Sequence, residues 1–192
     1  MWRWWCALLA LCAASVCLAG GPALPAEAQA GDLIFRRGTE SVSAMVLAID
    51  GGQFSHVGML VGRPGAWQVV HATPSEVPGR ADGVVVDALG FFLDPVRSRD
   101  YAVYRVDAPD ALRAAAVGEA LGQRGTRFRM ADPAGTYCTR LVWEAWRRAG
   151  VDLEVRFTRL ALPLMQGDYL LPTPLSRSPR LRRLALPQDA EG

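Results

Sequence analysis

The chain has 192 residues, of which 51% are hydrophobic and 21% are charged, and its formal net charge is +2. So small a charge gives no electrostatic basis for nucleic-acid binding, and we expect no nucleic-acid partner. The length suits a single domain that buries its own hydrophobic core without disulfide bonds, and we expect a monomer.

The first 30 residues are typical of an export signal. Arg3 gives a short positive region, and the run from Trp4 to Leu18 is uncharged and apolar. Two small-x-small cleavage patterns follow, at 26–28 and 28–30. Because the apolar run is shorter than the roughly 20 residues that a membrane-spanning helix needs, we expect cleavage, no remaining membrane span, and a periplasmic or extracellular location.

The rest of the chain alternates short strand and helix patterns. In chain order, periodicity and turn signals predict a strand at 31–35, a helix at 40–49, strands at 56–61, 67–73, 84–88 and 101–106, and helices at 108–123 and 137–149. We therefore expect one α+β domain over residues 31–175, with a small, mostly antiparallel sheet packed by helices. The Arg- and Pro-rich residues 176–192 predict a solvated tail.

Cys138 is the one cysteine outside the predicted leader. It begins the most strongly patterned helix, on an apolar stripe with Val142 and Ala145, after Thr136 as the predicted N-cap. The first turn of a helix offers unpaired N–H groups and the positive end of the macrodipole, so we expect a favoured thiolate and a nucleophilic Cys138. Its own N–H is a predicted oxyanion donor, and the Tyr137 hydroxyl is a candidate second donor and substrate-binding group.

His56 and His71 are the two histidines of the chain, and they lie in adjacent predicted strands. A hairpin that turns at 63–65 pairs residues whose numbers sum to about 127 to 129. The lower sum places the two histidines opposite each other, and the higher one makes them diagonal neighbours on one face. A shift of one residue would put them on opposite faces of the sheet.

Each of these residues also has a simpler explanation. A cysteine on an apolar stripe can be a buried core residue, and strand histidines are often structural. Two histidines and one cysteine could also ligate a catalytic zinc ion. The chain lacks the closely paired ligand spacing that zinc sites usually show, so the pattern favours a nucleophile that needs no metal and no cofactor.

Four motifs, in this order, resemble the permuted papain-like branch of the NlpC-type cysteine hydrolases, a bacterial amidase and peptidase family related to lecithin:retinol acyltransferase. The resemblance implies a permuted papain-like fold, Cys138 as nucleophile, His56 as base, and a third polar residue on the next strand, here His71. Many bacterial relatives have Glu at this third position, and the acyltransferase group has His. The motifs are Gly31 to Phe35, Phe54 to Gly58, Val69 to Ala72 and Tyr137 to Val142.

The residues and the resemblance together predict an exported cysteine hydrolase that cleaves an amide bond. Cys138 attacks the carbonyl carbon, His56 moves the proton, His71 orients His56, and water resolves the thioester. Export favours cell-wall (peptidoglycan) peptides as the substrate. Two alternatives stay open: a lipid ester hydrolase or acyltransferase, whose acyl chain Phe91 and Phe92 could contact, and a catalytically silent binding module on the same fold.

Overall fold

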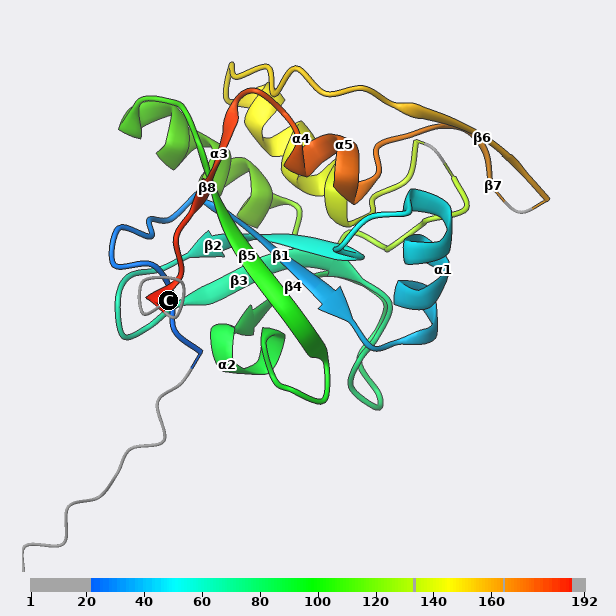
Figure 1. Cartoon of the computed structure of the whole chain (residues 1–192), viewed down its shortest axis with the longest axis horizontal. Coiled ribbons are helices and arrows are strands. Elements are labelled where there is room, and N and C mark those ends of the chain that lie inside the picture. The colour runs from blue at the N-terminus through cyan, green and yellow to red at the C-terminus, as the bar shows by residue number, and fades with distance from the viewer. Residues whose placement is uncertain (1–21, 133, 164, 188–192) are drawn as a thin grey trace, which may run out of the picture.

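A six-stranded sheet forms the centre of the protein, whose computed structural model describes residues 22–132, 134–163 and 165–187 (Figure 1). The strand order is β4-β3-β2-β1-β5-β8, and every neighbouring pair is antiparallel. This arrangement confirms the predicted α+β class with a mostly antiparallel sheet. The strands are β1 (Leu33–Gly38), β2 (His56–Val61), β3 (Gln68–Thr73), β4 (Gly83–Ala88), β5 (Ser98–Val106) and β8 (Leu181–Leu184).

Helices cover both faces of the sheet, because successive strand residues point to opposite sides. Helices α3 and α4 cover one face of the sheet and α2 covers the other (Figure 1). Leu33 and Phe35 pack in the core cluster with α3 and α4, whereas Ile34 packs in the cluster with α2. All three side chains are fully buried, which suits a central strand. The helices are α1 (Ser41–Asp50), α2 (Leu89–Phe92), α3 (Asp110–Gly122), α4 (Cys138–Arg148) and α5 (Pro172–Ser176).

Helix α4 has the amphipathic character that its sequence predicts. Val142, Ala145 and the fully buried Trp146 pack into the core, and the helix lies against β2 and β3. On the outer face, Arg140 and Glu144 form an i,i+4 ion pair at 2.8 Å. The residue before the helix is Tyr137 rather than Thr136, and no side chain caps this end. The first-turn N–H groups therefore remain available to a ligand or a sulfur.

The N-terminal boundary of the fold differs from the predicted one. Most of the predicted export signal, residues 1–21, lies outside the described residues, but residues 22–30 pack on the domain. The carbonyl oxygen of Ala23 accepts a hydrogen bond from the Tyr101 hydroxyl at 2.7 Å, and Ala28 is buried in the core cluster beneath α2. Ala28, which both predicted cleavage patterns share, is therefore part of the folded domain.

The predicted solvated tail also differs from the structure. Residues 181–184 form β8 at the edge of the central sheet, where Leu184 pairs with Val103 and is fully buried. The arginines of this strand face outward, whereas Leu181 and Leu184 face the protein. The segment is therefore an edge strand, although its basic composition is typical of a solvated tail. Residues 188–192 lie outside the described part of the chain.

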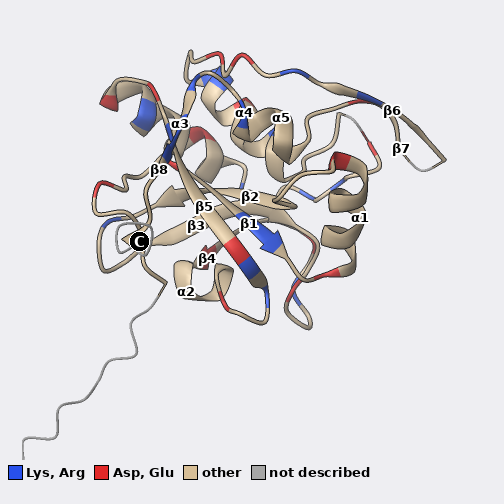
Figure 2. Cartoon of the chain, viewed as in Figure 1, with Lys and Arg blue, Asp and Glu red and all other residues tan. Residues whose placement is uncertain are grey.

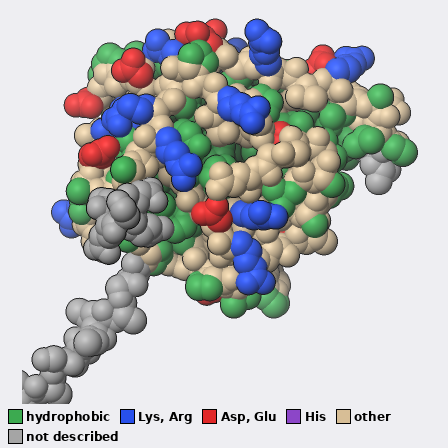
Figure 3. All heavy atoms as spheres, in the orientation of Figure 1, with side chains coloured by type: hydrophobic (Ala, Val, Ile, Leu, Met, Phe, Trp, Pro, Cys, Tyr) green, Lys and Arg blue, Asp and Glu red, His purple; other side chains and the backbone are tan. Residues whose placement is uncertain are grey.

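A second, two-stranded sheet projects beside α1, formed by β6 (Thr158–Leu162) and β7 (Met165–Tyr169) (Figure 1). The sequence does not predict it, because Pro163 and Gly167 are typical of loops. Charged residues of both signs are interspersed along the chain and over the face in view (Figures 2 and 3). Within the described residues, no helix has both the length and the apolar character needed to span a membrane.

Candidate active site

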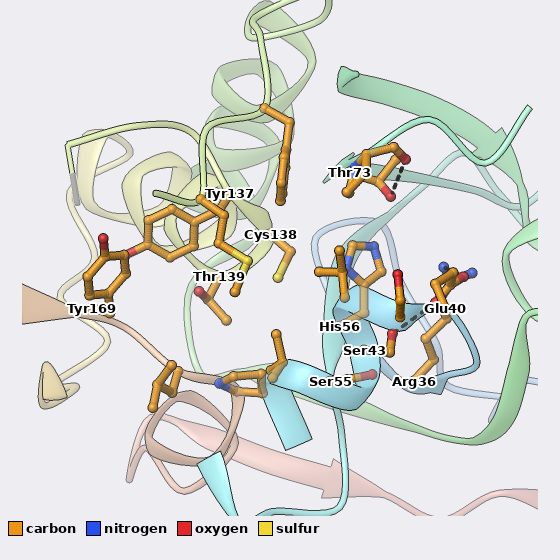
Figure 4. A pocket seen from close by; sticks show the side chains of 18 of the residues that line it. Arg36, Glu40, Ser43, Ser55, His56, Thr73, Tyr137, Cys138, Thr139 and Tyr169 are labelled. Atoms are coloured by element: carbon orange, nitrogen blue, oxygen red, sulfur yellow. Dashed lines mark hydrogen bonds and ion pairs between the residues drawn. The ribbon is translucent and has the colours of Figure 1, made fainter. Parts of the chain in front are cut away.

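Cys138 and His56 line the same pocket, which has a volume of about 190 Å³ (Figure 4). Cys138 comes from the first residue of α4, and His56 from the first residue of β2. Because α4 packs against β2, the thiol lies close to the backbone N–H of Val57, the residue after His56. The fold thus brings together the predicted nucleophile and the predicted base, which are 82 positions apart in sequence.

His71 extends this site as a hydrogen-bonded partner of His56. The Nε2 atom of His56 lies 2.8 Å from the Nδ1 atom of His71. Strands β2 and β3 pair with residue numbers that sum to 129, as in Met59 with Val70, so the histidines are diagonal neighbours on one face. With Nε2 engaged by His71, the Nδ1 atom of His56 is the nitrogen left to exchange a proton with the thiol.

Asp87 follows His71 in the same hydrogen-bond chain, and the sequence analysis does not predict it. Its Oδ2 atom lies 3.1 Å from the Nε2 atom of His71, and its Oδ1 atom accepts a hydrogen bond from Arg80 at 2.7 Å. The register of β3 with β4 pairs Val69 with Asp87, which places this carboxylate on the histidine face. The available signal was a single acid at the end of an otherwise apolar predicted strand.

The ionisation of the Cys–His pair differs from the sequence prediction. Burial raises the pKa of the Cys138 thiol to about 11, and the nearby N–H groups of Val57 and Thr139 offset only part of this effect. Burial also lowers the pKa of His56 well below its ordinary value, and the charge of Arg36 lowers it further. The resting pair is therefore a neutral thiol beside a neutral imidazole, because the helix N-terminus does not outweigh desolvation.

Arg36 is a buried cation at the polar end of the pocket, and it too was not predicted. Its side chain is 1% exposed, and the register of β1 with β2 pairs Arg36 directly with His56. It donates to the Glu76 carboxylate at 2.8 Å, to the Glu40 carboxylate at 3.0 Å, and to the carbonyl oxygen of Phe92 at 2.7 Å. These contacts tie β1, α1, α2 and the loop after β3 together around His56.

The Tyr137 side chain lines the pocket, and its hydroxyl oxygen acts as an acceptor. The hydroxyl oxygen accepts a hydrogen bond from the N–H of Leu170 at 3.2 Å, and the ring packs against Tyr169. Burial raises the pKa of Tyr137, so the group stays protonated. Figure 4 shows the two tyrosines together on the side of Cys138 away from His56.

Phe92 supports the two histidines from the core and does not line the pocket. It is fully buried, and its ring centroid lies 5.0 Å from that of His71 and 5.6 Å from that of His56. Phe91 packs beneath the guanidinium of Arg97 at 3.9 Å. Phe91 and Phe92 both belong to the short helix α2, and Phe92 is a core residue and not part of a surface for an acyl chain.

The residues do not fit the metal site considered from the sequence. Within the described residues, no group of three or more His, Cys, Asp or Glu side chains is arranged to hold a metal ion. The facing nitrogens of His56 and His71 bond to each other instead of converging on a common ligand position. We therefore derive no catalytic step through a metal.

Comparison with known proteins agrees with the geometry. A family model of permuted papain-like amidase enzymes, the YaeF/YiiX or C92 family, matches residues 27–184. A crystal structure described as the metalloprotein YiiX from Escherichia coli O157:H7 has 20% sequence identity and a TM-score of 0.67, covering 82% of this chain and 97% of that chain, which shows the shared fold. No curated protein matches the chain. The chain therefore belongs to the C92 family of permuted papain-like amidases and is a cysteine hydrolase.

Proposed function

We propose that this protein hydrolyses an amide bond through a thioester on Cys138, with His56 as the general base and His71 as its positioning partner. The hydrogen bond of 2.8 Å between the two histidines, at the pocket that holds the thiol, carries this proposal. It directs the remaining nitrogen of His56 toward proton exchange and fixes the ring, which are the two requirements of a nucleophile–base pair.

The reaction begins from the neutral pair. As the sulfur attacks the carbonyl carbon, the thiol proton moves to His56, and the N–H of Cys138 donates to the oxyanion, since a first-turn N–H has no acceptor within its helix. The C–N bond then breaks, and His56 returns the proton to the leaving amine. Water, deprotonated by His56, attacks the thioester, which releases a carboxylic acid and restores the thiol.

We further propose that the protein is exported and acts on cell-wall peptide amides. The leader-like composition of the first residues supports export, and peptidoglycan is an amide-rich polymer outside the cytoplasm. The family match supports amide hydrolysis in general. Arg36, Glu40 and Glu76 line the polar end of the pocket and offer charged groups to a peptide substrate.

The pocket wall favours a second candidate, an amide or ester with an apolar acyl group. Beside the thiol, the wall is built by α1, the segment before α4, and the β7–α5 segment, and its side chains there are mostly hydrocarbon. A bound acyl chain would contact these side chains and would be removed from water. The apolar lining residues are Val42, Val46, Phe128, Met130, Met165, Leu170, Leu171 and Pro172.

One assay separates these candidates. The protein is incubated with purified peptidoglycan, with N-acyl amino acids and with phospholipid vesicles, and new amines and free fatty acids are measured alongside Cys138→Ala. Amines from peptidoglycan support the first candidate; fatty acids, or amino acids from the N-acyl probes, support the second. A covalent acyl adduct on Cys138, detected by mass spectrometry, supports the thioester. No product from any substrate, together with a thiol that iodoacetamide does not alkylate at alkaline pH, would support a binding module instead.

A further inference from the structure

We propose that Asp87, held by Arg80, is a positioning residue that fixes which nitrogen of each histidine carries the proton. The role depends on the proposed function, because Asp87 acts through His71 and His56 on Cys138. With this residue the site becomes a chain of side chains that crosses three neighbouring strands, from β4 through β3 to β2.

The contacts of this chain are short and mostly buried. His71 is fully buried, and the Asp87 side chain is 10% exposed. The Arg80 guanidinium holds both carboxylate oxygens of Asp87, at 2.7 Å and 3.3 Å. From Asp87 the chain continues to His71 at 3.1 Å and from His71 to His56 at 2.8 Å. A carboxylate gripped on both oxygens has little freedom to turn away from the imidazole.

The carboxylate decides the direction of every hydrogen bond after it. An ionised carboxylate only accepts, so the Nε2 atom of His71 must carry a proton and donate to Asp87. In a neutral imidazole the other nitrogen then has no proton, so the Nδ1 atom of His71 accepts from His56. His56 therefore carries its proton on Nε2 and presents a bare Nδ1, which is the nitrogen that a general base needs toward Cys138.

The charges around the chain support this assignment. Burial would raise the pKa of Asp87, but the hydrogen bonds from His71 and Arg80 outweigh it and hold the pKa below its ordinary value. Burial lowers the pKa of His71, and the hydrogen bond to Asp87 offsets only part of this effect. Arg36 lowers the pKa of both histidines, and Glu76 opposes it at His71. At neutral pH the chain therefore holds one carboxylate and two neutral rings.

Asn at position 87 should reverse the donor and acceptor roles along this series of hydrogen bonds and not merely weaken the bonds. In Asp87→Asn, Arg80 donates to the amide oxygen, so the amide NH₂ group faces His71 and requires a bare Nε2 there. The proton of His71 then moves to Nδ1 and donates to His56, whose own proton moves to Nδ1 and blocks transfer from the thiol. In serine proteases the equivalent exchange costs about 10⁴ in rate through the wrong tautomer.

Nitrogen NMR of the full chain labelled with ¹⁵N-histidine tests the assignment without any substrate. Because the sequence has two histidines, the four ring nitrogens are observed against no background. We expect protonated Nε2 and bare Nδ1 on both rings in the wild type, and the reverse pattern in Asp87→Asn. Asp32→Asn is the matched control, because Asp32 is also buried and paired with arginines but takes no part in the hydrogen bonds that link Asp87, His71 and His56. Unchanged ring nitrogens in Asp87→Asn would overturn the proposal.

A double variant gives a second test, because the proposal predicts that adding Arg80→Met to Asp87→Asn raises the rate of hydrolysis and does not lower it. Arg80→Met alone should slow hydrolysis of a p-nitrophenyl acyl ester by about 10-fold, since it removes both charge-assisted contacts that orient Asp87. Asp87→Asn should slow it by at least about 100-fold. In the combined variant the amide can turn its oxygen to His71, so the rate should exceed that of Asp87→Asn alone. A combined variant no faster than Asp87→Asn would refute the tautomer mechanism. Hydrolysis retained in Cys138→Ala would instead refute the proposed function and leave the NMR result standing.

Discussion

The Nε2 atom of His56 and the Nδ1 atom of His71 lie 2.8 Å apart, joined across two neighbouring strands and not through a loop. Their contact follows from the β2–β3 register, and a shift of one residue would put the rings on opposite faces. Gly58 lies between them on the same face, where a Cβ would come within 3.1 Å of the His71 Cβ and overlap Val69. The position of His56, the proposed base, is therefore set by the sheet itself.

The pH dependence of thiol alkylation tests the neutral resting pair. With the pKa of Cys138 raised to about 11, the thiolate fraction is small at neutral pH. The rate of reaction with iodoacetamide should rise about tenfold per pH unit from about pH 7 to pH 10. Peptide mass spectrometry assigns the label to Cys138. A rate that is already level near pH 6 would show a thiolate–imidazolium pair and contradict this expectation.

Stability should fall in mild acid because both histidines are buried and neutral. Their pKa values are lowered by burial, so the unfolded chain binds protons that the folded chain does not. The free energy of unfolding therefore decreases as the pH falls below about 6.5, by up to about 1.4 kcal/mol per pH unit for each histidine. Asp87, with its lowered pKa, adds to this loss only at lower pH, near 4 and below. Urea unfolding from pH 7.5 to pH 5 measures the slope.

The matched control for this slope is His56→Gln/His71→Gln, in which both titrating imidazole rings are replaced by amides that do not titrate. Its free energy of unfolding should change much less over the same pH range. An equally steep loss in the double variant would assign the acid sensitivity to other groups.

The residue at position 71 should tolerate Gln better than Glu. The amide of Gln can accept from His56 with its oxygen and donate to Asp87 with its NH₂ group, which keeps the observed direction of both bonds. Glu would place a second carboxylate against Asp87 at a fully buried position, where like charges repel strongly. We expect the order of kcat/KM to be His71→Gln above His71→Glu, with His56→Ala lowest. His71→Glu/Asp87→Asn should regain activity relative to His71→Glu, and failure to do so would remove charge repulsion as the cause.

A buried ion-pair cluster at Asp32 should contribute strongly to stability. Asp32 is fully buried and accepts hydrogen bonds from Arg105 and Arg113, both at 3.0 Å at their closest, and from the N–H of Gln29. Asp32→Ala leaves two guanidinium groups without their carboxylate and should cost about 3 to 5 kcal/mol in denaturant unfolding. Glu144→Ala, at a more exposed pair on α4, should cost less than about 1 kcal/mol. Equal effects would contradict the importance of burial.

If the protein is exported, as we propose, its mature N-terminus should lie before Ala23. Residues 22–30 contribute the bonds of Ala23 to Tyr101 and of Glu27 to Arg105, and the buried Ala28. Cleavage at either predicted small-x-small pattern would remove some or all of these contacts. N-terminal sequencing of secreted protein measures the site directly. A chain that begins at Gly31 should unfold at lower urea than one that begins at Pro22, and equal midpoints would show that the segment adds nothing.

The sequence by itself predicted the class of fold, and it singled out Cys138 and His56 as the candidate nucleophile and base. Cys138 begins the helix with the clearest apolar stripe, and local periodicity is sufficient to define such an element because it depends on neighbours three and four positions away. The two histidines could be placed on adjacent strands for the same reason, through one short turn. Even their pairing was limited to a few registers by the length of that turn.

Only the tertiary structure decided what surrounds these residues. Asp87 bonds to His71, and Arg80 holds Asp87. Arg36 pairs with His56 in the sheet, and no local pattern specifies the strand order that brings these residues together. The pKa of Cys138 depends on how much water the packed pocket excludes, and that desolvation outweighs the helix N-terminus that the sequence does show. The edge strand at 181–184 likewise looks like a basic tail until the sheet provides its partner, because strand pairing is a long-range interaction.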